Sequence, residues 1–356
     1  MKKFVLIILI VLGLVYSYFW YVRGIDLLLS GDETVYLPPY TKFAVRLPVP
    51  SADQMDSSNP VWSSALSMPT PRSDAAAASI GNIIYVVGGT DSFARTVATV
   101  EAFDMSANTW LTVADLPKAL HHVALVVHDN KLYSLGGLEG LSMTPSSDVY
   151  LFDPKVGTWE KINPMLSAVG AAAAVVHQGK IHVLGGQAAT GITDLHMVYD
   201  PSDRQWSWGT ALLAPRGYHG AASLGNQLVI FGGRSGSLAY NLRTTDILLD
   251  GSEDWERWEP MSIKRSGFGT AQLGGTVYAF GGEAPTLVMD TVEMLDPELH
   301  AWKLMPAMPT ARQGAAVATA GGRIFVIGGG KHVGVSVSDI NEVFIPSGYV
   351  KSEDEQ

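Results

Sequence analysis

The chain contains no cysteine, which excludes disulfide bonds, thiolate metal sites, a thiol nucleophile and an acylated cysteine anchor. It also has no Asn-x-Ser/Thr acceptor, so nothing in it indicates N-glycosylation. Basic residues are few: 24 lysines and arginines are outnumbered by 34 aspartates and glutamates, and the net charge is −10. Because proteins that bind nucleic acid usually present a broad basic surface, this balance argues against a nucleic-acid partner.

A long uncharged segment stands at the N-terminus. Residues 4–22 carry no charged side chain and, at about 1.5 Å of rise per residue, come close to spanning a bilayer as a helix. Trp20 lies where interfacial aromatic residues are expected, and Arg23 follows. Lys2 and Lys3 are expected to stay in the cytoplasm, which places the rest of the chain on the other side of the membrane, in a periplasmic or extracellular compartment.

A cleaved signal peptide is the alternative to a membrane anchor. Val15, Tyr16 and Ser17 form an acceptable cleavage site after an apolar run of suitable length. We favour an uncleaved anchor because apolar and aromatic residues continue beyond Ser17.

Composition divides the chain into four parts. Residues 1–23 form the cytoplasmic stub and the expected transmembrane helix, and residues 24–59 are rich in Pro, Ser and acidic residues, as expected of a stalk. Residues 60–346 hold a repeat, described next, and residues 347–356 form a charged tail.

The repeat is marked by pairs of glycines that end short apolar runs. The pairs are 88–89, 136–137, 185–186, 232–233, 281–282 and 328–329. A tryptophan precedes every pair at the same offset: Trp62, Trp110, Trp159, Trp206, Trp255 and Trp302. Each unit reads as four short strands separated by turn residues, and four strands in about 45–50 residues are typical of one blade of a β-propeller.

This pattern resembles the Kelch repeat, in which a double glycine ends the second strand and a tryptophan stands on the fourth. The resemblance implies an all-β, six-bladed propeller over residues 60–346. The sixth unit ends without a tryptophan strand, whereas Trp62 precedes the first unit. We therefore expect residues 61–66 to supply the outer strand of the last blade and to close the ring.

The glycine pair and the tryptophan, which recur in each unit, have different expected roles. The first two strands of a blade crowd the axis, where a glycine pair permits close backbone approach and unusual φ values. The tryptophans are expected far from the axis, where they fill the wider gaps between blades.

Strand direction predicts where a site lies. Residues just before the first strand and just after the glycine pair meet on one face, around the pore. Arginines recur there, and we expect a site for an anion such as an acidic peptide segment or an acidic sugar. The expected ligand contacts are Arg72, Arg216, Arg234, Arg265, Arg312, His122, Tyr218 and Gln187. In the alternative interpretation, an arginine that recurs in a repeat bonds backbone carbonyls of the adjacent blade.

One carboxylate, Glu283, follows a glycine pair on this face. Its "GEA" context is similar to that of bacterial Kelch-type mutarotases and epimerases that act on sialic acid, and the resemblance implies a proton acceptor. Galactose oxidase also has this propeller style, but its copper-radical site requires cysteine, which is absent here. The sequence predicts no metal and no cofactor, since the histidines are scattered and no phosphate-binding loop occurs.

The sequence thus predicts a membrane-tethered binding module for a protein or an acidic glycan. A sugar mutarotase or epimerase and a scaffold within an envelope complex are the alternatives, because propellers host all three functions.

Overall fold

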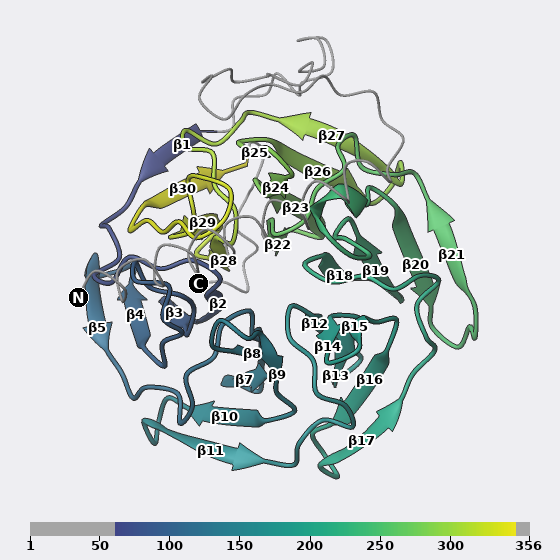
Figure 1. Cartoon of the computed structure of the whole chain (residues 1–356), viewed down its shortest axis with the longest axis horizontal. Helices are drawn as coiled ribbons and strands as arrows, with labels where there is room; N and C mark the ends of the chain where they lie inside the picture. The colour runs from purple at the N-terminus through teal and green to yellow at the C-terminus, as the bar shows by residue number, and fades with distance from the viewer. Residues whose placement is uncertain (1–60, 347–356) are drawn as a thin grey trace, which may run out of the picture. The chain divides into compact units, whose positions relative to one another are not determined.

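Each repeat of the sequence forms one four-stranded antiparallel sheet in the computed structural model, which describes residues 61–346. In the first five sheets, called blades 1 to 5, strands follow one another from the axis outwards (Figure 1). Blade 1 contains β2 (Ala76–Ile80), β3 (Ile83–Val87), β4 (Val100–Asp104) and β5 (Thr109–Thr112). Blade 2 contains β6 (Ala124–His128), β7 (Lys131–Leu135), β10 (Val149–Asp153) and β11 (Thr158–Ile162).

The next three blades repeat this order. Blade 3 contains β12 (Ala173–His177), β13 (Lys180–Leu184), β16 (His196–Asp200) and β17 (Gln205–Trp208). Blade 4 contains β18 (Gly220–Leu224), β19 (Gln227–Phe231), β20 (Thr245–Leu249) and β21 (Trp255–Trp258). Blade 5 contains β22 (Gly269–Leu273), β23 (Thr276–Phe280), β26 (Val292–Asp296) and β27 (Ala301–Met305).

Blade 6 joins the two ends of the ring. It contains β28 (Ala316–Ala320), β29 (Arg323–Ile327), β30 (Asn341–Ile345) and, as its outer strand, β1 (Val61–Ser64). β1 pairs antiparallel with β30, and Trp62 lies opposite Phe344. Figure 1 shows this junction as the purple strand beside the yellow one. The six-bladed all-β fold and the predicted closure of the ring through β1 are confirmed.

Short elements extend some loops between second and third strands. Blades 2, 3 and 5 carry two-stranded ribbons, and blade 4 carries a single 3-10 turn, η2 (Leu238–Tyr240). The ribbons are β8 (Leu138–Glu139) with β9 (Thr144–Pro145), β14 (Gln187–Ala188) with β15 (Gly191–Ile192), and β24 (Glu283–Ala284) with β25 (Leu287–Val288).

The glycine pairs bring neighbouring blades into backbone contact. In all six pairs φ is positive, 59–64° at the first glycine and 87–110° at the second. The second glycine donates its N–H to a carbonyl of the next blade at 2.8–3.0 Å. A Cβ on Gly328 would lie 2.6 Å from the oxygen of Arg72, and one on Gly89 would lie 2.6 Å from that of Ser73. Both expected reasons for the pairs, unusual φ and close approach, are therefore met.

The tryptophans connect the blades at the outer edge. Each indole Nε1 donates to an oxygen of the preceding blade at 2.9–3.1 Å. In five blades the acceptor is the carbonyl four residues after the preceding tryptophan, whereas Trp302 donates to the hydroxyl of Thr245. The hydrophobic core lies between blades, so that Val86 of blade 1 packs in one cluster with Phe325 of blade 6.

The predicted stalk, tail and membrane helix lie outside residues 61–346. Within the described part of the chain, no helix is long and apolar enough to cross a membrane. The expected anchor at residues 4–22 therefore stays a prediction.

Candidate functional site

One face of the propeller collects two sets of connections from every blade. The loops from the second to the third strand and the segments that lead into the next first strand both lie there. In all six blades the residue three positions before the first strand forms a β-bridge with the residue after the glycine pair. The bridges are Ser73–Thr90, His121–Leu138, Gly170–Gln187, Gly217–Arg234, Ser266–Glu283 and Gln313–Gly330. The two predicted sets of site positions therefore meet on one face, which we call the pore-mouth face.

A closed ring of backbone hydrogen bonds surrounds the axis on this face. Its six members, one from each blade, are Asp74, His122, Ala171, Tyr218, Gly267 and Gly314. Each donates its N–H to the carbonyl of the member before it, at 2.8–3.0 Å, and the N–H of Asp74 closes the circle on Gly314. All six have φ between 51 and 61°, a left-handed conformation that is costly for residues with a Cβ.

The ring presents side chains unevenly. Asp74, His122 and Tyr218 project large polar or aromatic groups, whereas blades 3, 5 and 6 offer alanine or glycine. A Cβ on Gly267 would lie 3.5 Å from Oε1 of Glu283, so this carboxylate lies directly beside the ring.

The four arginines that recur before the first strands do not reach the mouth. Arg72, Arg216, Arg265 and Arg312 have no exposed surface. Nη1 of each donates to the carbonyl of the first glycine of its own blade at 2.7–3.5 Å. Burial lowers the pKa of each guanidinium, and the carboxylate beside it opposes this effect. These four arginines are therefore not the ligand contacts that the sequence led us to expect. They bond backbone carbonyls, as in the alternative interpretation, but those of their own blade rather than of the adjacent one.

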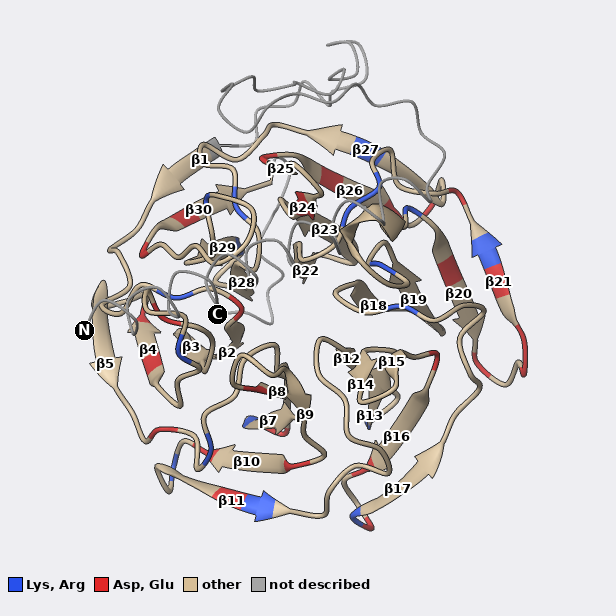
Figure 2. Ribbon diagram, in the orientation of Figure 1, with Lys and Arg blue, Asp and Glu red and all other residues tan. Residues whose placement is uncertain are grey.

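Each buried arginine pairs with a carboxylate on the third strand of its blade. The pairs are Arg72–Glu101, Arg216–Asp246, Arg265–Glu293 and Arg312–Glu342. Figure 2 marks an acidic residue within each of the four third strands β4, β20, β26 and β30.

Blades 2 and 3 lack both members of the pair. Leu120 and Val169 replace the arginine, and Tyr150 and Met197 replace the acid. The arginine and the acid are thus present or absent together, a pattern that is visible in the sequence. It would have indicated that the arginines pair with these acids inside the blade.

The remaining predicted residues do converge at the mouth. The guanidinium of Arg234 lies 3.5 Å above the centroid of the Tyr218 ring. Its Nη1 donates to Oε1 of Glu283 at 3.2 Å and to Oγ of Ser266 at 3.5 Å. The Tyr218 hydroxyl donates to Oε1 of Gln187 at 2.7 Å. The mouth thus holds one cation against an aromatic face, with a carboxylate beside it.

The cluster continues across the axis through His122. The His122 ring lies 5.1 Å from that of Tyr218, and its Nε2 is 3.3 Å from a carboxylate oxygen of Asp74. Burial lowers the pKa of His122 to about 4 despite the opposing effect of Asp74, so the imidazole is neutral at pH 7. We call Asp74, His122, Gln187, Tyr218, Arg234 and Glu283 the mouth cluster; Asp74 was not among the predicted contacts.

Exposed apolar side chains stand on the loops around the mouth cluster. They belong to the loops that follow the glycine pairs of blades 1, 2, 4 and 6: Phe93, Leu141, Tyr240 and Val335, with 77, 79, 43 and 66% of their surface exposed. We call these four residues the apolar rim. Large apolar groups gathered in loops on one face are typical of an interaction surface.

Among residues 61–346 no group of three His, Asp or Glu side chains is arranged to hold a metal ion. The arrangement at the mouth suits recognition of an anion, since the guanidinium provides charge and directional donors.

Comparisons with known proteins agree with this architecture. The family model described as the KLHDC2/KLHL20/DRC7 Kelch-repeats domain matches residues 51–233 and 171–345. Kelch-like protein terF of Aspergillus terreus is 30% identical over 78% of this chain and 65% of its own length. Human Kelch-like protein 33 is 39% identical over 35% of this chain and 24% of its own length. The chain thus spans less than two thirds of either relative.

A solved propeller is also similar in fold. The structure titled "Structure of YjhT" superimposes with a TM-score of 0.68 at 15% identity, and the match covers 78% of this chain and 95% of that one. Together with the repeat, the glycine pairs and the closure through β1, the family match leads to one conclusion: this chain belongs to the Kelch-repeat family.

Proposed function

We propose that the pore-mouth face binds a partner protein through an acidic segment of that partner. The observation that carries the proposal is the position of Arg234, held over Tyr218 at the centre of a face whose loops expose the apolar rim. Kelch propellers commonly mediate protein interactions, which supports this choice over a small-molecule ligand.

Arg234 suits an incoming carboxylate for two reasons. A guanidinium carries five N–H donors, and both of its hydrogen bonds to Ser266 and Glu283 start from Nη1. Its side chain keeps 15% of its surface exposed, so the charge is only partly desolvated before binding. An acidic group that reaches this partly buried charge gains more than it would from a fully exposed one.

The apolar rim supplies the area that a charge contact lacks. Phe93, Leu141 and Val335 are each more than half exposed and come from three different blades. A partner that spans the mouth would cover them while its acidic segment reaches Arg234, which combines apolar contact area with charge complementarity.

Replacing Arg234 by glutamine is expected to weaken binding of acidic peptides about tenfold or more, because a charge-assisted hydrogen bond is lost. The full-length chain in detergent would be tested on an array of peptides of graded acidity, with acidic glycans on the same array. Lys331→Gln is the matched control, since it removes a positive charge from an exposed loop on the same face. Because the pKa of His122 is about 4, titration of this residue is expected to leave binding unchanged between pH 6 and 8.

Equal loss of binding in Arg234→Gln and Lys331→Gln would show that overall charge, rather than the mouth, attracts the ligand. Binding of acidic glycans alone would replace the protein partner by a carbohydrate.

A mutarotase or epimerase of an acidic sugar is the second candidate. It is favoured by one observation, the placement of Glu283 beside Arg234, where a substrate carboxylate and a catalytic carboxylate would meet. Glu283 already pairs with Arg234 at 3.2 Å, so a substrate carboxylate would have to compete with it for the guanidinium, and we rank this function below binding. The full chain would have to accelerate anomer exchange of sialic acid, as seen by NMR, and Glu283→Gln would have to abolish that acceleration.

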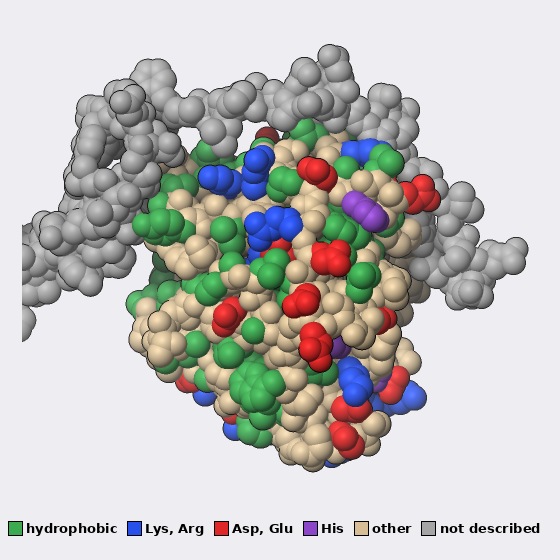
Figure 3. Space-filling model, turned by 90° about the vertical axis from the view of Figure 1, so that its right-hand side faces the viewer, with side chains coloured by type: hydrophobic (Ala, Val, Ile, Leu, Met, Phe, Trp, Pro, Cys, Tyr) green, Lys and Arg blue, Asp and Glu red, His purple; other side chains and the backbone are tan. Residues whose placement is uncertain are grey.

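We also propose that residues 4–22 tether the propeller to a membrane on its extracytoplasmic side. The uncharged run after Lys2 and Lys3 supports this proposal. Release of the full chain from membranes by alkaline carbonate would contradict it. A scaffold role through the wall has less support, because Figure 3 shows charges of both signs mixed with scattered apolar groups on the side it presents.

A further inference from the structure

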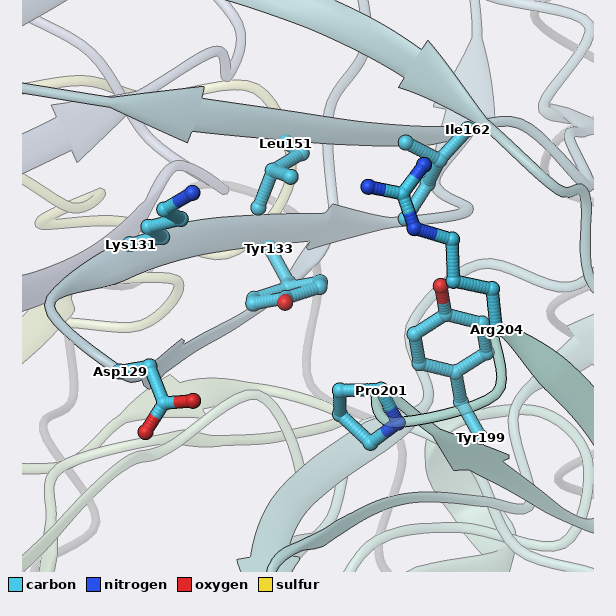
Figure 4. Close-up of a pocket in the computed structure, with 8 residues that line it drawn as sticks. All are labelled: Asp129, Lys131, Tyr133, Leu151, Ile162, Tyr199, Pro201 and Arg204. Carbon is cyan, nitrogen blue, oxygen red and sulfur yellow. The ribbon is translucent and has the colours of Figure 1, made fainter.

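A recess lies on the face opposite the mouth, between blades 2 and 3. It is a cleft of about 220 Å³ near the tight turns of the two blades. β7 contributes Tyr133 and Lys131, and the segment from β16 into its turn contributes Tyr199 and Arg204 (Figure 4). None of these residues belongs to the mouth cluster.

The repeat itself shows what is unusual here. Beside the cleft, the second strand of one blade packs against the third strand of the next blade. Four of the six interfaces between blades have an aromatic pair at this position. The other three pairs are Tyr85–Phe152, Tyr278–Phe344 and Phe103–Phe325, each with at most one hydroxyl. Tyr133 and Tyr199, with ring centroids 6.3 Å apart, carry two.

Both hydroxyls border the cleft without a hydrogen bond. The two tyrosines are 6% and 2% exposed, and among the described residues no group is hydrogen-bonded to either phenol oxygen. Burial raises the pKa of both, so each is a neutral O–H donor at pH 7. Both phenol oxygens keep some accessible surface in the cleft, so each is free to donate a hydrogen bond to an acceptor that binds there.

The charges around the cleft define the acceptor. Arg204 lies at its rim with 64% of its side-chain surface exposed, and its Nη1 is 4.0 Å from a carboxylate oxygen of Glu160. Lys131 is turned towards Asp153, at 3.2 Å. Asp129 lines the other end, and its charge would repel a second negative group on the ligand.

We propose that this cleft binds a small monocarboxylate with a flat apolar body. Tyr133 and Tyr199 donate to the carboxylate, Arg204 neutralises it, and Leu151 and Ile162 contact the apolar part. Pockets for drug-sized ligands occupy about 300–1,000 Å³, so this smaller cleft suits a single-ring acid.

Benzoate is the probe, and calorimetric titration of the full-length chain is the measurement. We expect saturable binding that Tyr199→Phe and Tyr133→Phe each weaken about tenfold, because each removes a hydrogen bond to a charged group without changing shape. Arg204→Gln, which alters an exposed side chain, is expected to weaken it as well. Tyr85→Phe is the control, since it removes a hydroxyl from the equivalent position of blade 1.

Benzyl alcohol, which lacks the charge, is expected to bind at least tenfold more weakly than benzoate. Equal benzoate affinity for the wild type and the Tyr133→Phe/Tyr199→Phe double variant would overturn the proposal, as would the absence of saturable binding. The mouth variant Arg234→Gln should bind benzoate normally, which separates this site from the proposed function.

Discussion

Replacing Arg265 by leucine is expected to destabilise the propeller by about 3–5 kcal/mol, because Glu293 would be left as a buried charge without its partner. The two side chains have no exposed surface, and Nη2 of the arginine lies 2.8 Å from Oε2 of the glutamate. The loss would appear in the free energy of unfolding from urea titration, monitored by tryptophan fluorescence.

The double variant Arg265→Leu/Glu293→Met should recover most of this stability. Blade 3 already combines an apolar residue at the arginine position with Met197 on the third strand, and replacing both members of a buried ion pair by apolar groups is often nearly neutral. A double variant as unstable as Arg265→Leu alone would contradict this interpretation of the pair.

Gly136→Ala is expected to cost several kcal/mol of stability. The new Cβ would overlap the carbonyl oxygen of Val169 in the next blade and would lie 2.7 Å from Met165, at a φ of +60°. Left-handed strain alone accounts for about 1–2 kcal/mol. The remainder would come from the separation of blades 2 and 3, because the backbone acceptor cannot move out of the way.

The Gly225→Ala variant measures the cost of the left-handed backbone conformation alone. This glycine has a φ of +58° in the inner turn of blade 4, with nothing within 4 Å of the added Cβ. It should therefore lose only the 1–2 kcal/mol of conformational strain. Similar losses in the two alanine variants would mean that contact between blades does not explain the glycine pairs.

Much of the fold could be predicted because it depends on spacing. The glycine pairs and the tryptophans recur in register, and each has a backbone or packing role that few other residues can fill. The unmatched Trp62 was sufficient to predict that β1 completes blade 6.

The mouth cluster was predicted in part. Residues that follow a glycine pair, such as Gln187, Arg234 and Glu283, were assigned to the correct face because strand direction determines it. The buried arginines shared a similar sequence position, but position does not give side-chain direction, and their guanidinium groups turn into the blade towards the third strand. The acidic residues on the third strands would have distinguished the buried arginines from the residues that face the mouth.

The cleft between blades 2 and 3 could not be predicted in the same way. Tyr133 and Tyr199 occupy ordinary apolar positions of the strand pattern. Their hydroxyls become informative only when the second strand of blade 2 and the third strand of blade 3 are placed side by side.

We infer that the buried arginines stabilise the blades, whereas Arg234 binds the ligand. The most direct test compares the free energies of unfolding of the Arg265→Leu and Arg234→Gln variants. We predict a loss of about 3–5 kcal/mol for Arg265→Leu. Arg234→Gln, which loses a partly exposed ion pair and a cation–π contact, should lose no more than about 2 kcal/mol. Equal losses, or a greater loss for Arg234→Gln, would contradict the assignment of Arg234 to ligand binding.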